Sequence, residues 1–381
     1  MTYRLLHSAD LHLDRAFAAH GCHGDLARRR RAGLRDALRL IGDLARAERC
    51  DAVMIAGDLY EHDRSGIDTE RFLAATFAAW QPISVFIAPG NHDALLPGSL
   101  YRRVSWPSNV HVFETPALAP VELEDGLTLW GLAHREPGWM GNPLEGGRPQ
   151  ASSGVHLAFF HGAELGSRPE GKSIHGPFRA EEIHDRGFAL ALCGHYHRRR
   201  IDRDSGLVYP GSPEPLTFDE AGPRGPVIVD VDSDGATTCT PLDTNRWSAV
   251  SVSCDASGCA STSDLSDACV AACNAALSSE RDRAMIRIDV EGDVDCSVSV
   301  DVAALERETG ERTGAAVVQV RDQSRPAIDI ESAAAERSAR GAFVRAVIDA
   351  REHADEHELG VLDDALRYGL EALAGAEVGL R

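Results

Sequence analysis

The chain has 381 residues, 43% of them hydrophobic, a content that is ordinary for a globular protein and a length that predicts two or three domains. No run of 18 apolar residues occurs and the first residues enter a strand almost at once, so we expect neither a membrane span nor a signal peptide, and a cytoplasmic protein. The formal net charge of −20 excludes a surface that is basic throughout, so any affinity for nucleic acid must come from a local group of arginines.

The first 90 residues alternate short apolar segments with amphipathic ones. Residues 3–7, 52–56 and 84–88 are rich in large apolar side chains, which predicts buried strands. Between them, residues 25–48 and 68–80 repeat apolar side chains at the 3.6-residue spacing of a helix. This alternation predicts a layered α/β core whose first strands are parallel.

From residue 110 the pattern changes to shorter strands, interrupted by a loop. Residues 138–154 are rich in Gly, Pro and Ser, which predicts a loop that either covers the crevice described below or is disordered. The turns Asp204–Gly206 and Asp232–Gly235 suit hairpins. Two sheets that face each other, with helices outside, are therefore expected. The strands are predicted at residues 110–113, 117–123, 127–133, 155–160, 188–192, 198–202, 207–210, 226–231 and 236–242.

Five of the apolar segments end in a turn that carries Asp, Asn or His. Ligands of open α/β sheets collect beyond the carboxyl ends of such strands, so these side chains should converge on one crevice. The turn glycines Gly57, Gly90 and Gly194 suit the unusual backbone angles found where a strand ends at a site. The polar side chains of the five turns are Asp10, His12, Asp58, Asn91, His92, Asp93, His161, His195 and His197.

Imidazole nitrogen, carboxylate oxygen and amide oxygen form a mixed set of metal ligands. Such a set suits Mn, Fe, Zn, Co or Ni better than Ca or Mg, which favour oxygen alone. Four histidines, two aspartates and one asparagine are too many for one tetrahedral ion, but they fit two ions that share a bridging carboxylate. Two carboxylates against two divalent cations leave the site positive, so it should attract an anionic phosphoester.

These residues carry a resemblance to a known family. Asp10-x-His12, Gly57-Asp58, Gly90-Asn91-His92-Asp93, His161 and Gly194-His195-x-His197 look like the five motifs of the calcineurin-like metallophosphoesterases. The surrounding sequence is similar to that of bacterial DNA repair exonucleases of the SbcD/YhaO type. The similar segments are HSADLHLDRAF at 7–17, GDLYEHD at 57–63, APGNHDALLPGSLY at 88–101 and CGHYHRRR at 193–200. The resemblance extends to about residue 240 and implies a four-layered α/β/β/α sandwich of two facing sheets.

The resemblance also implies how two metal ions are held, with Mn the first expectation and Fe, Zn, Co or Ni the alternatives. One ion would be held by Asp10, His12, Asp58 and His197. Asp58 would bridge to a second ion, which would also be bound by Asn91, His161 and His195.

Two further residues receive roles from the resemblance, and two receive none. His92 would lie near the scissile phosphate as a proton donor or charge stabiliser. Asp93 would orient His92 or support the turn, as groups behind metal ligands often do. Some nuclease relatives carry a histidine three residues after the bridging aspartate; here Glu61 takes that place and His62 follows, so neither is assigned.

The predicted domains are 1–243, carrying the metal ligands, 244–325, and 326–381. The middle domain should be a small α/β cap, which in the family helps select DNA, with strands at 248–252, 284–290 and 315–320 and helices at 262–279 and 301–308. The last segment is rich in Ala, Glu and Arg and is predicted to be helical. It either packs on its own cap domain or docks a coiled-coil ATPase subunit of the SbcC type, the partner that the resemblance implies; a homodimer is a further expectation.

The arginines and the cysteines bear on DNA binding and on the redox state of the thiols. The DNA-contacting candidates flank the ligand motifs, whereas Arg28–Arg31 is expected to be a solvated helix face. The nine cysteines are odd in number and contain no C-x₂-C pair, which favours reduced thiols over a zinc site. The DNA-contacting candidates are Arg102, Arg103, Arg198, Arg199 and Arg200.

Three functions follow, in decreasing order of support. The first is a two-metal-dependent DNA exonuclease or endonuclease in DNA repair or end processing. The second is a phosphodiesterase or phosphatase acting on small molecules or phosphoproteins. The third is a non-catalytic scaffold, which is disfavoured because no ligand position is lost.

Overall fold

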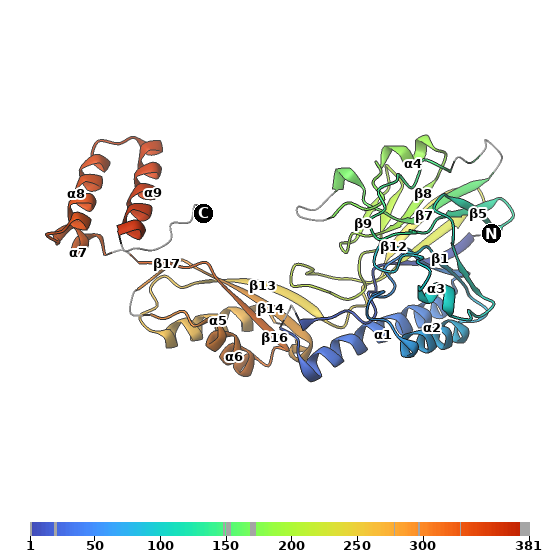
Figure 1. The fold of residues 1–381 in the computed structure, drawn as a ribbon, viewed down its shortest axis with the longest axis horizontal. Coiled ribbons are helices and arrows are strands. Elements are labelled where there is room, and N and C mark those ends of the chain that lie inside the picture. The colour runs from blue at the N-terminus through green and yellow to red at the C-terminus, as the bar shows by residue number, and fades with distance from the viewer. Residues whose placement is uncertain are drawn as a thin grey trace. The chain divides into compact units, whose positions relative to one another are not determined.

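The computed structural model describes residues 2–18, 21–147, 149, 154–167, 173–277, 279–295, 298–327 and 329–373 (Figure 1). Parts of the predicted loop 138–154 and of the predicted segment 326–381 lie outside the described residues, namely 148, 150–153, 328 and 374–381. Among the helices that are described, none is long and apolar enough to cross a membrane.

The chain divides into two compact units. One consists of Met1–Val252, Cys273–Ile288 and Glu306–Val320, and the other of Ser253–Ala272, Asp289–Leu305 and Arg321–Arg381. The domain boundaries expected from the sequence, after residues 243 and 325, remain predictions.

The first unit contains two mixed sheets of six strands each. In one, β1, β2 and β3 are parallel, as predicted for the first 90 residues, and β4 joins them in parallel; β11 and β12 extend the sheet in antiparallel pairing beside β1. Its strands, in spatial order, are β12 (Thr237–Pro241), β11 (Val227–Asp232), β1 (Thr2–Ser8), β2 (Ala52–Ile55), β3 (Ser84–Ile87) and β4 (Val110–Val112).

In the other sheet, β6, β7, β8 and β10 are parallel, and β5 and β9 form antiparallel edges. Its strands, in spatial order, are β5 (Ala119–Glu124), β6 (Leu127–Gly131), β7 (Val155–His161), β8 (Leu190–Gly194), β10 (Leu207–Tyr209) and β9 (Arg200–Asp202). Every strand predicted in the first 242 residues is therefore present, with ends shifted by a few residues.

The two sheets pack face to face, and helices cover the outside of the first. The layer between the sheets is apolar and joins Met54 and Phe86 of one sheet to Leu129, Phe159 and Leu192 of the other. Helices α1 (Gly24–Ala47) and α2 (Ile67–Ala79) lie against the outer face of the first sheet (Figure 1). The outer face of the second sheet is covered by the chain that includes the short helix α4 (Glu181–Asp185).

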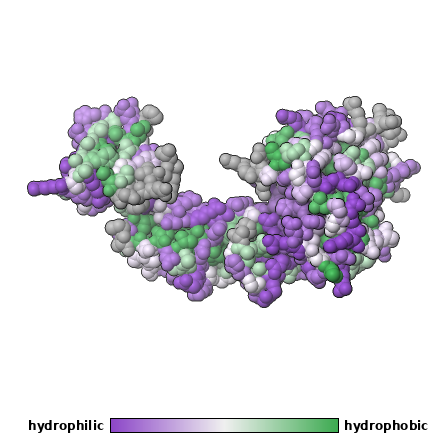
Figure 2. Space-filling model, viewed as in Figure 1, coloured by the Kyte–Doolittle hydropathy of each residue, from purple (hydrophilic) through white to green (hydrophobic). Residues whose placement is uncertain are grey.

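Helix α1 buries the apolar face predicted for it, and its solvent face is hydrophilic (Figure 2). The prediction that Arg28–Arg31 is a solvated face is wrong for Arg30, which is only 1% exposed. Its guanidinium lies 4.5 Å from the ring centroids of both Phe17 and Trp247. A planar cation can stack in this way on aromatic rings, and Trp247 lies too far along the chain for a local pattern to reveal it.

The remaining elements include those predicted for the small α/β cap, 244–325, and for the last segment, 326–381. Strands β13, β14 and β16 form a three-stranded sheet, and β15 pairs with β17 in parallel. The elements are α3 (Leu100–Arg103), η2 (Leu165–Ser167), β13 (Ser248–Asp255), α5 (Thr262–Ala276), η3 (Arg281–Arg283), β14 (Ala284–Glu291), β15 (Asp293–Val294), α6 (Val302–Thr313), β16 (Val317–Asp322), β17 (Arg325–Pro326), α7 (Ile330–Ala335), α8 (Ala339–Arg351) and α9 (Glu356–Leu373).

The C-terminal segment is helical as predicted, but it is divided into three helices that share a small core of their own. Asp329 caps α7 by accepting a hydrogen bond from the Ser332 N–H (2.9 Å), and Ser338 caps α8 through the Gly341 N–H (3.1 Å). The shared core contains Ala333, Val344, Val347, Leu366 and Leu370.

Candidate metal centre

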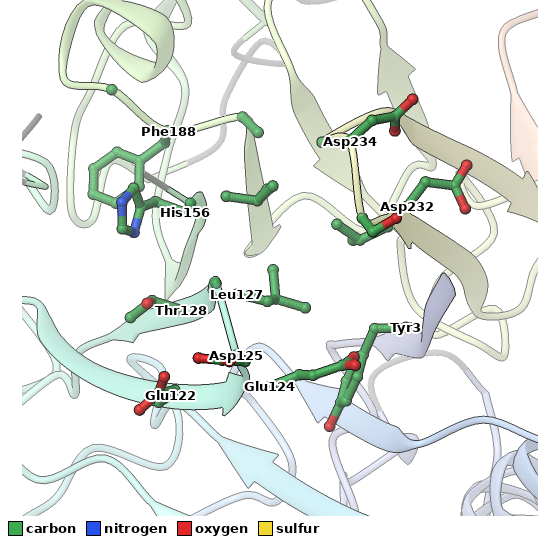
Figure 3. Close-up of a pocket in the computed structure, with 18 of the residues that line it drawn as sticks. Tyr3, Glu122, Glu124, Asp125, Leu127, Thr128, His156, Phe188, Asp232 and Asp234 are labelled. Carbon is green, nitrogen blue, oxygen red and sulfur yellow. The ribbon is translucent and has the colours of Figure 1, made fainter. Parts of the chain in front are cut away.

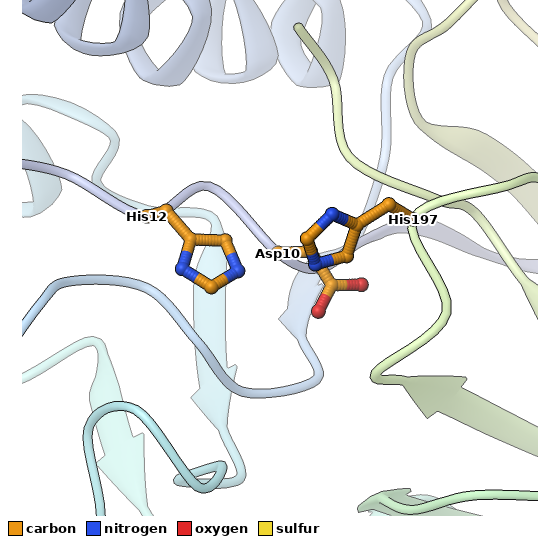
Figure 4. A group of neighbouring side chains, drawn as sticks. All are labelled: Asp10, His12 and His197. Carbon is orange, nitrogen blue, oxygen red and sulfur yellow. The ribbon is translucent and has the colours of Figure 1, made fainter. Parts of the chain in front are cut away.

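The turns after β1, β2, β3, β7 and β8 bring the predicted ligands together. The ligand atoms of Asp10, His12 and His197 lie within 4.8 Å of one another (Figure 4). Those of Asp10, Asp58 and His161 do the same. Asp10 thus belongs to two adjacent groups, each with the composition of a transition-metal site.

Asp58 belongs to the second group and also faces a histidine of the first. Its Oδ2 lies 3.6 Å from Nε2 of His12 and 3.4 Å from Nε2 of His161. Its Oδ1 accepts a hydrogen bond from the backbone N–H of His92 at 2.8 Å. One carboxylate therefore faces a histidine of each predicted ion, which is what a bridging ligand requires.

Asn91 and His195 lie beside His161. The Asn91 Oδ1 is 3.0 Å from Nε2 of His161, and the ring of His195 packs edge-on against the ring of His161 at 5.2 Å. The backbone N–H of His195 also donates to both carboxylate oxygens of Asp10, at 3.1 and 3.2 Å. All seven predicted ligands are thus linked through direct neighbours.

Each of the four histidines has one ring nitrogen beside an oxygen that can accept its proton. That arrangement leaves the other nitrogen unprotonated and able to bind a metal ion, as in most protein metal sites. For His12 that other nitrogen, Nε2, is buried and has no hydrogen-bond partner among the described residues. The four pairs are His12 Nδ1 with Glu61 (2.9 Å), His161 Nδ1 with the Ala56 carbonyl (2.9 Å), His195 Nε2 with the Ser173 carbonyl (3.1 Å) and His197 Nδ1 with Glu220 (2.8 Å).

Burial keeps two of these rings neutral. Removal from water lowers the pKa of His161 to about 3, and burial together with the neighbouring His161 lowers the pKa of His195 to about 3. Near neutral pH both imidazoles are therefore uncharged, and a metal ion need not displace a proton to bind them. The donor set and its protonation fit a pair of divalent transition-metal ions.

The backbone is strained at four of the seven predicted ligands. Asp10, His12, Asp58 and His195 have φ angles of 54°, 48°, 50° and 111°, in a region that side chains other than glycine rarely adopt. Such strain persists where the surrounding structure requires it, and it is typical of functional sites. A Cβ on Gly90 would lie 2.5 Å from Oδ1 of Asp58 and 2.9 Å from Cγ of His161, so this turn needs a glycine.

Asp93 supports the turns rather than orienting His92, which were the two roles expected for it. Its carboxylate accepts hydrogen bonds from the backbone N–H groups of Asp58 (3.2 Å), Leu59 (2.6 Å) and Gly90 (2.6 Å). The hydroxyl of Tyr101 donates a fourth, at 2.6 Å. Asp93 therefore fixes the β2 and β3 turns against each other.

Tyr101→Phe should lower stability by about 1–3 kcal/mol, because it leaves the buried carboxylate of Asp93 without one of its donors. Thermal unfolding measures the effect. Tyr3→Phe, which removes a hydroxyl far from this network, is the matched control. An equal loss of stability in both variants would show that the Tyr101–Asp93 hydrogen bond stabilises the fold no more than the hydroxyl of Tyr3 does.

Glu61, which the sequence left unassigned, joins the metal centre to His92. Its carboxylate lies 2.9 Å from Nδ1 of His12 and 2.9 Å from Nδ1 of His92, with Arg15 at 3.5 Å. Burial lowers the pKa of His92, but the hydrogen bond with Glu61 and the charge of Asp58 outweigh it and raise the pKa to about 9. Glu61 therefore both fixes the His92 ring and favours its protonated form.

Glu220 was not found from the sequence. It contacts Nδ1 of His197 at 2.8 Å and also accepts hydrogen bonds from the Ser212 hydroxyl (3.0 Å) and the Leu216 N–H (2.9 Å). Burial raises the pKa of Glu220, but its hydrogen bond with His197 and the charge of Arg224 outweigh burial and lower the pKa to about 2. The carboxylate is thus ionised and holds His197 in place.

Glu220→Gln should weaken metal binding about 10–100-fold, because partners behind a ligand fix its ring and raise its basicity. Competition with a fluorescent chelator measures the dissociation constant. Glu122→Gln, an exposed site on β5, is the control. Unchanged affinity in the Glu220 variant, with native unfolding temperature, contradicts the role given to Glu220.

The arginines predicted to contact DNA have different surroundings. Arg102, Arg103 and Arg198 are exposed. Arg199 instead forms an ion pair with Asp243 (2.8 Å) and donates to the Leu242 carbonyl (2.7 Å). Arg200 pairs with Glu164 (3.2 Å) and Asp202 (3.0 Å). Arg102, Arg103 and Arg198 can therefore contact a phosphate directly, whereas Arg199 and Arg200 would first have to break these ion pairs.

A large cavity, of about 930 Å³, lies away from these ligands (Figure 3). Its lining residues lie near the amino ends of β1, β6 and β7, at the edge of the sheets opposite the metal ligands. None of the predicted site residues is among them. Its negative charge makes it unsuited to a phosphate. The carboxylates that line it are Glu122, Glu124, Asp125, Asp232 and Asp234.

The chain is similar to two curated proteins and to a solved structure. Metallophosphoesterase YhaO of Bacillus subtilis, itself uncharacterized, is 28% identical over 238 residues, 59% of this chain and 57% of that protein. The DNA double-strand break repair protein Mre11 of Methanopyrus kandleri is 28% identical over 261 residues, 61% of this chain and 55% of that protein. The chain thus spans about half the length of the curated relatives it matches. The crystal structure of TT1561 of Thermus thermophilus is 14% identical, with a TM-score of 0.37, and covers 63% of this chain and 99% of its own.

The family model that matches the chain covers the complete set of turns. The calcineurin-like phosphoesterase family matches residues 3–199, which is more than half of the 381 residues. The match runs from β1 past His197, so it includes every predicted metal ligand. The chain belongs to the calcineurin-like phosphoesterase family.

Proposed function

We propose that this chain is a two-metal-dependent DNA exonuclease or endonuclease that hydrolyses phosphodiester bonds in DNA repair or DNA end processing. The observation that carries the proposal is the pair of ligand groups that share Asp10, with the half-exposed His92 beside them. The Mre11 relative is a DNA double-strand break repair protein, which supports DNA as the substrate.

The roles of the residues follow from their contacts. Two ions bound by the predicted ligands would activate water and neutralise charge on the phosphate. Glu61 holds Nδ1 of His92, which leaves Nε2 of the same ring to donate a proton to the leaving oxygen. The side chain of His92 is 42% exposed, so a substrate can reach it. Asp93 and Glu220 keep the turns and His197 in place.

The test compares two substrates under the same conditions. With Mn²⁺, the protein should release nucleotides from the ends of duplex DNA and should also hydrolyse bis-p-nitrophenyl phosphate; chelation with EDTA should abolish both. Hydrolysis of the small ester alone, with no cutting of DNA at any salt concentration, would favour the alternative, a phosphodiesterase or phosphatase acting on small molecules or phosphoproteins.

We further propose that α7, α8 and α9 dock a coiled-coil ATPase subunit of the SbcC type. The three helices pack on one another, and Val361 and Leu373 of α9 remain 59% and 48% exposed. Exposed apolar side chains on a helix suit a helical partner. Pull-down of a purified ATPase subunit by the full chain and by a variant lacking residues 329–381 tests this; equal capture by both contradicts it.

A further inference from the structure

Two cysteine side chains meet inside the second compact unit. Cys254 lies near the end of β13 and Cys269 lies in the middle of α5, and both positions belong to that unit. Their sulfur atoms are 3.6 Å apart, and the thiol of Cys269 donates a hydrogen bond to the sulfur of Cys254. Both are buried free cysteines. The fold therefore brings together two thiols that are 15 positions apart in the sequence.

This arrangement is close to that of a disulfide. The sulfurs of a disulfide lie about 2.0 Å apart, so bond formation needs an approach of about 1.5 Å. Rotation of each side chain about its Cα–Cβ bond can supply such a movement. β13 is an edge strand of the three-stranded sheet, so its backbone can also move more readily than that of a central strand. The two thiols can therefore join without a change of fold.

Cys254 is the sulfur that is better prepared to react. The hydrogen bond from Cys269 lowers the pKa of the Cys254 thiol, although burial and the charge of Asp255 oppose this shift. The thiolate is the form of cysteine that attacks an oxidant. The neighbouring residues Ser253 and Asp255 are exposed, so Cys254 lies just beneath the surface. A small uncharged oxidant therefore has a short path to this sulfur.

A metal ion explains the pair less well. Structural zinc sites take four ligands, and two of them here would have to come from groups other than these thiols. Among the residues that the structure describes, no cysteine belongs to a group of three or more side chains placed to hold a metal ion. The chemistry open to two adjacent thiols without further ligands is oxidation to a disulfide.

We propose that Cys254 and Cys269 form a modification site at which hydrogen peroxide oxidises the two thiols to a disulfide that links β13 to α5. The Cys254 thiolate attacks one oxygen of the peroxide, the O–O bond breaks, and hydroxide leaves and takes up the proton that Cys254 had released. The sulfur of Cys269 then attacks the sulfenic acid on Cys254, the S–S bond forms, and the sulfenic oxygen leaves as a second water. The two sulfurs together lose two electrons, which the peroxide accepts. No predicted metal ligand takes part, so the inference is independent of the nuclease proposal.

The first test identifies the link by mass spectrometry. The purified full chain is treated with hydrogen peroxide, its remaining thiols are alkylated in denaturant, and it is cleaved on the amino side of aspartate. This cleavage places Cys254 on peptide 243–254 and Cys269 on peptide 267–281. The two peptides should be joined in most chains, and dithiothreitol should separate them.

Matched variants show which thiols form the link. Cys269→Ala should abolish it. Cys273→Ala removes a thiol that is equally buried one turn further along α5, and it should leave the link intact. Cys259→Ala, at a half-buried position, should also leave it intact. The inference is overturned if Cys254 stays alkylated under conditions that oxidise Cys259, or if the peptides are joined as often in Cys269→Ala as in the unmodified protein.

The second test measures whether a disulfide fits the native structure. A link that closes a loop of 15 residues restricts the unfolded chain, so the oxidised protein should unfold at a temperature about 5–10 °C higher than the reduced protein. Cys273→Ala should show the same rise, and Cys269→Ala should show none. A linked protein that unfolds at the same or a lower temperature contradicts the inference, because the bond would then strain the native structure.

Discussion

Asp58→Asn is expected to reduce hydrolysis of bis-p-nitrophenyl phosphate about 10³-fold or more, equal to roughly 4 kcal/mol of transition-state stabilisation. Oδ2 of Asp58 faces both His12 and His161, so its negative charge serves both predicted ions. Asparagine keeps the shape and can still accept the hydrogen bond from the His92 N–H, so the turn should remain folded. The variant therefore removes the shared charge and little else.

Elemental analysis distinguishes the loss of the shared negative charge from a loss of the fold. The unmodified protein should bind two ions per chain, and Asp58→Asn should bind one or none while it keeps its unfolding temperature. Asp68→Asn is the matched control, because Asp68 of α2 pairs with Arg35 of α1 and its side chain is 84% exposed. Two tightly bound ions in the Asp58 variant would refute the bridging role, whatever happens to turnover.

The ligand turns could be predicted from the sequence because their signals are local. A short apolar strand followed by glycine and a polar residue, as in Gly57-Asp58 or Gly194-His195, depends only on adjacent positions. The parallel order of the strands then places all such turns at one edge. The same local reasoning gave α1 and α2, whose apolar faces repeat at helical spacing.

The residues that the sequence missed act over distances that no local pattern records. Glu220 contacts His197 from 23 positions away, beyond β9 and β10, and it lies in a segment with no helix or strand. Arg30 is buried by Trp247, and so a run that resembles a solvated helix face contains a core residue. Glu61 stood at an informative place, three residues after Asp58, but only the turn geometry shows that its side chain, and not that of His62, bridges His12 and His92.

His92→Asn is expected to lower turnover on DNA about 10²–10⁴-fold, the usual contribution of a general acid. The loss should be far smaller for bis-p-nitrophenyl phosphate, because p-nitrophenolate leaves readily without a proton. His92 is not among the predicted ligands, so both ions should remain bound. His111→Asn, at an exposed histidine of β4, is the control.

A variant of Glu61 tests the same role of His92. Because Glu61 holds the His92 ring, its loss should slow hydrolysis of DNA more than hydrolysis of bis-p-nitrophenyl phosphate, as His92→Asn does. Glu61→Gln keeps a hydrogen-bond acceptor for His92 but loses the charge that favours the protonated ring. Its loss on DNA should therefore be smaller than that of His92→Asn, and the double variant should be no slower than His92→Asn alone. Two results would mean that Glu61 acts through the metal ligand His12 and not through His92. The first is a double variant whose loss of turnover is the sum of the two single losses, and the second is a loss of turnover in Glu61→Gln that is equal on both substrates.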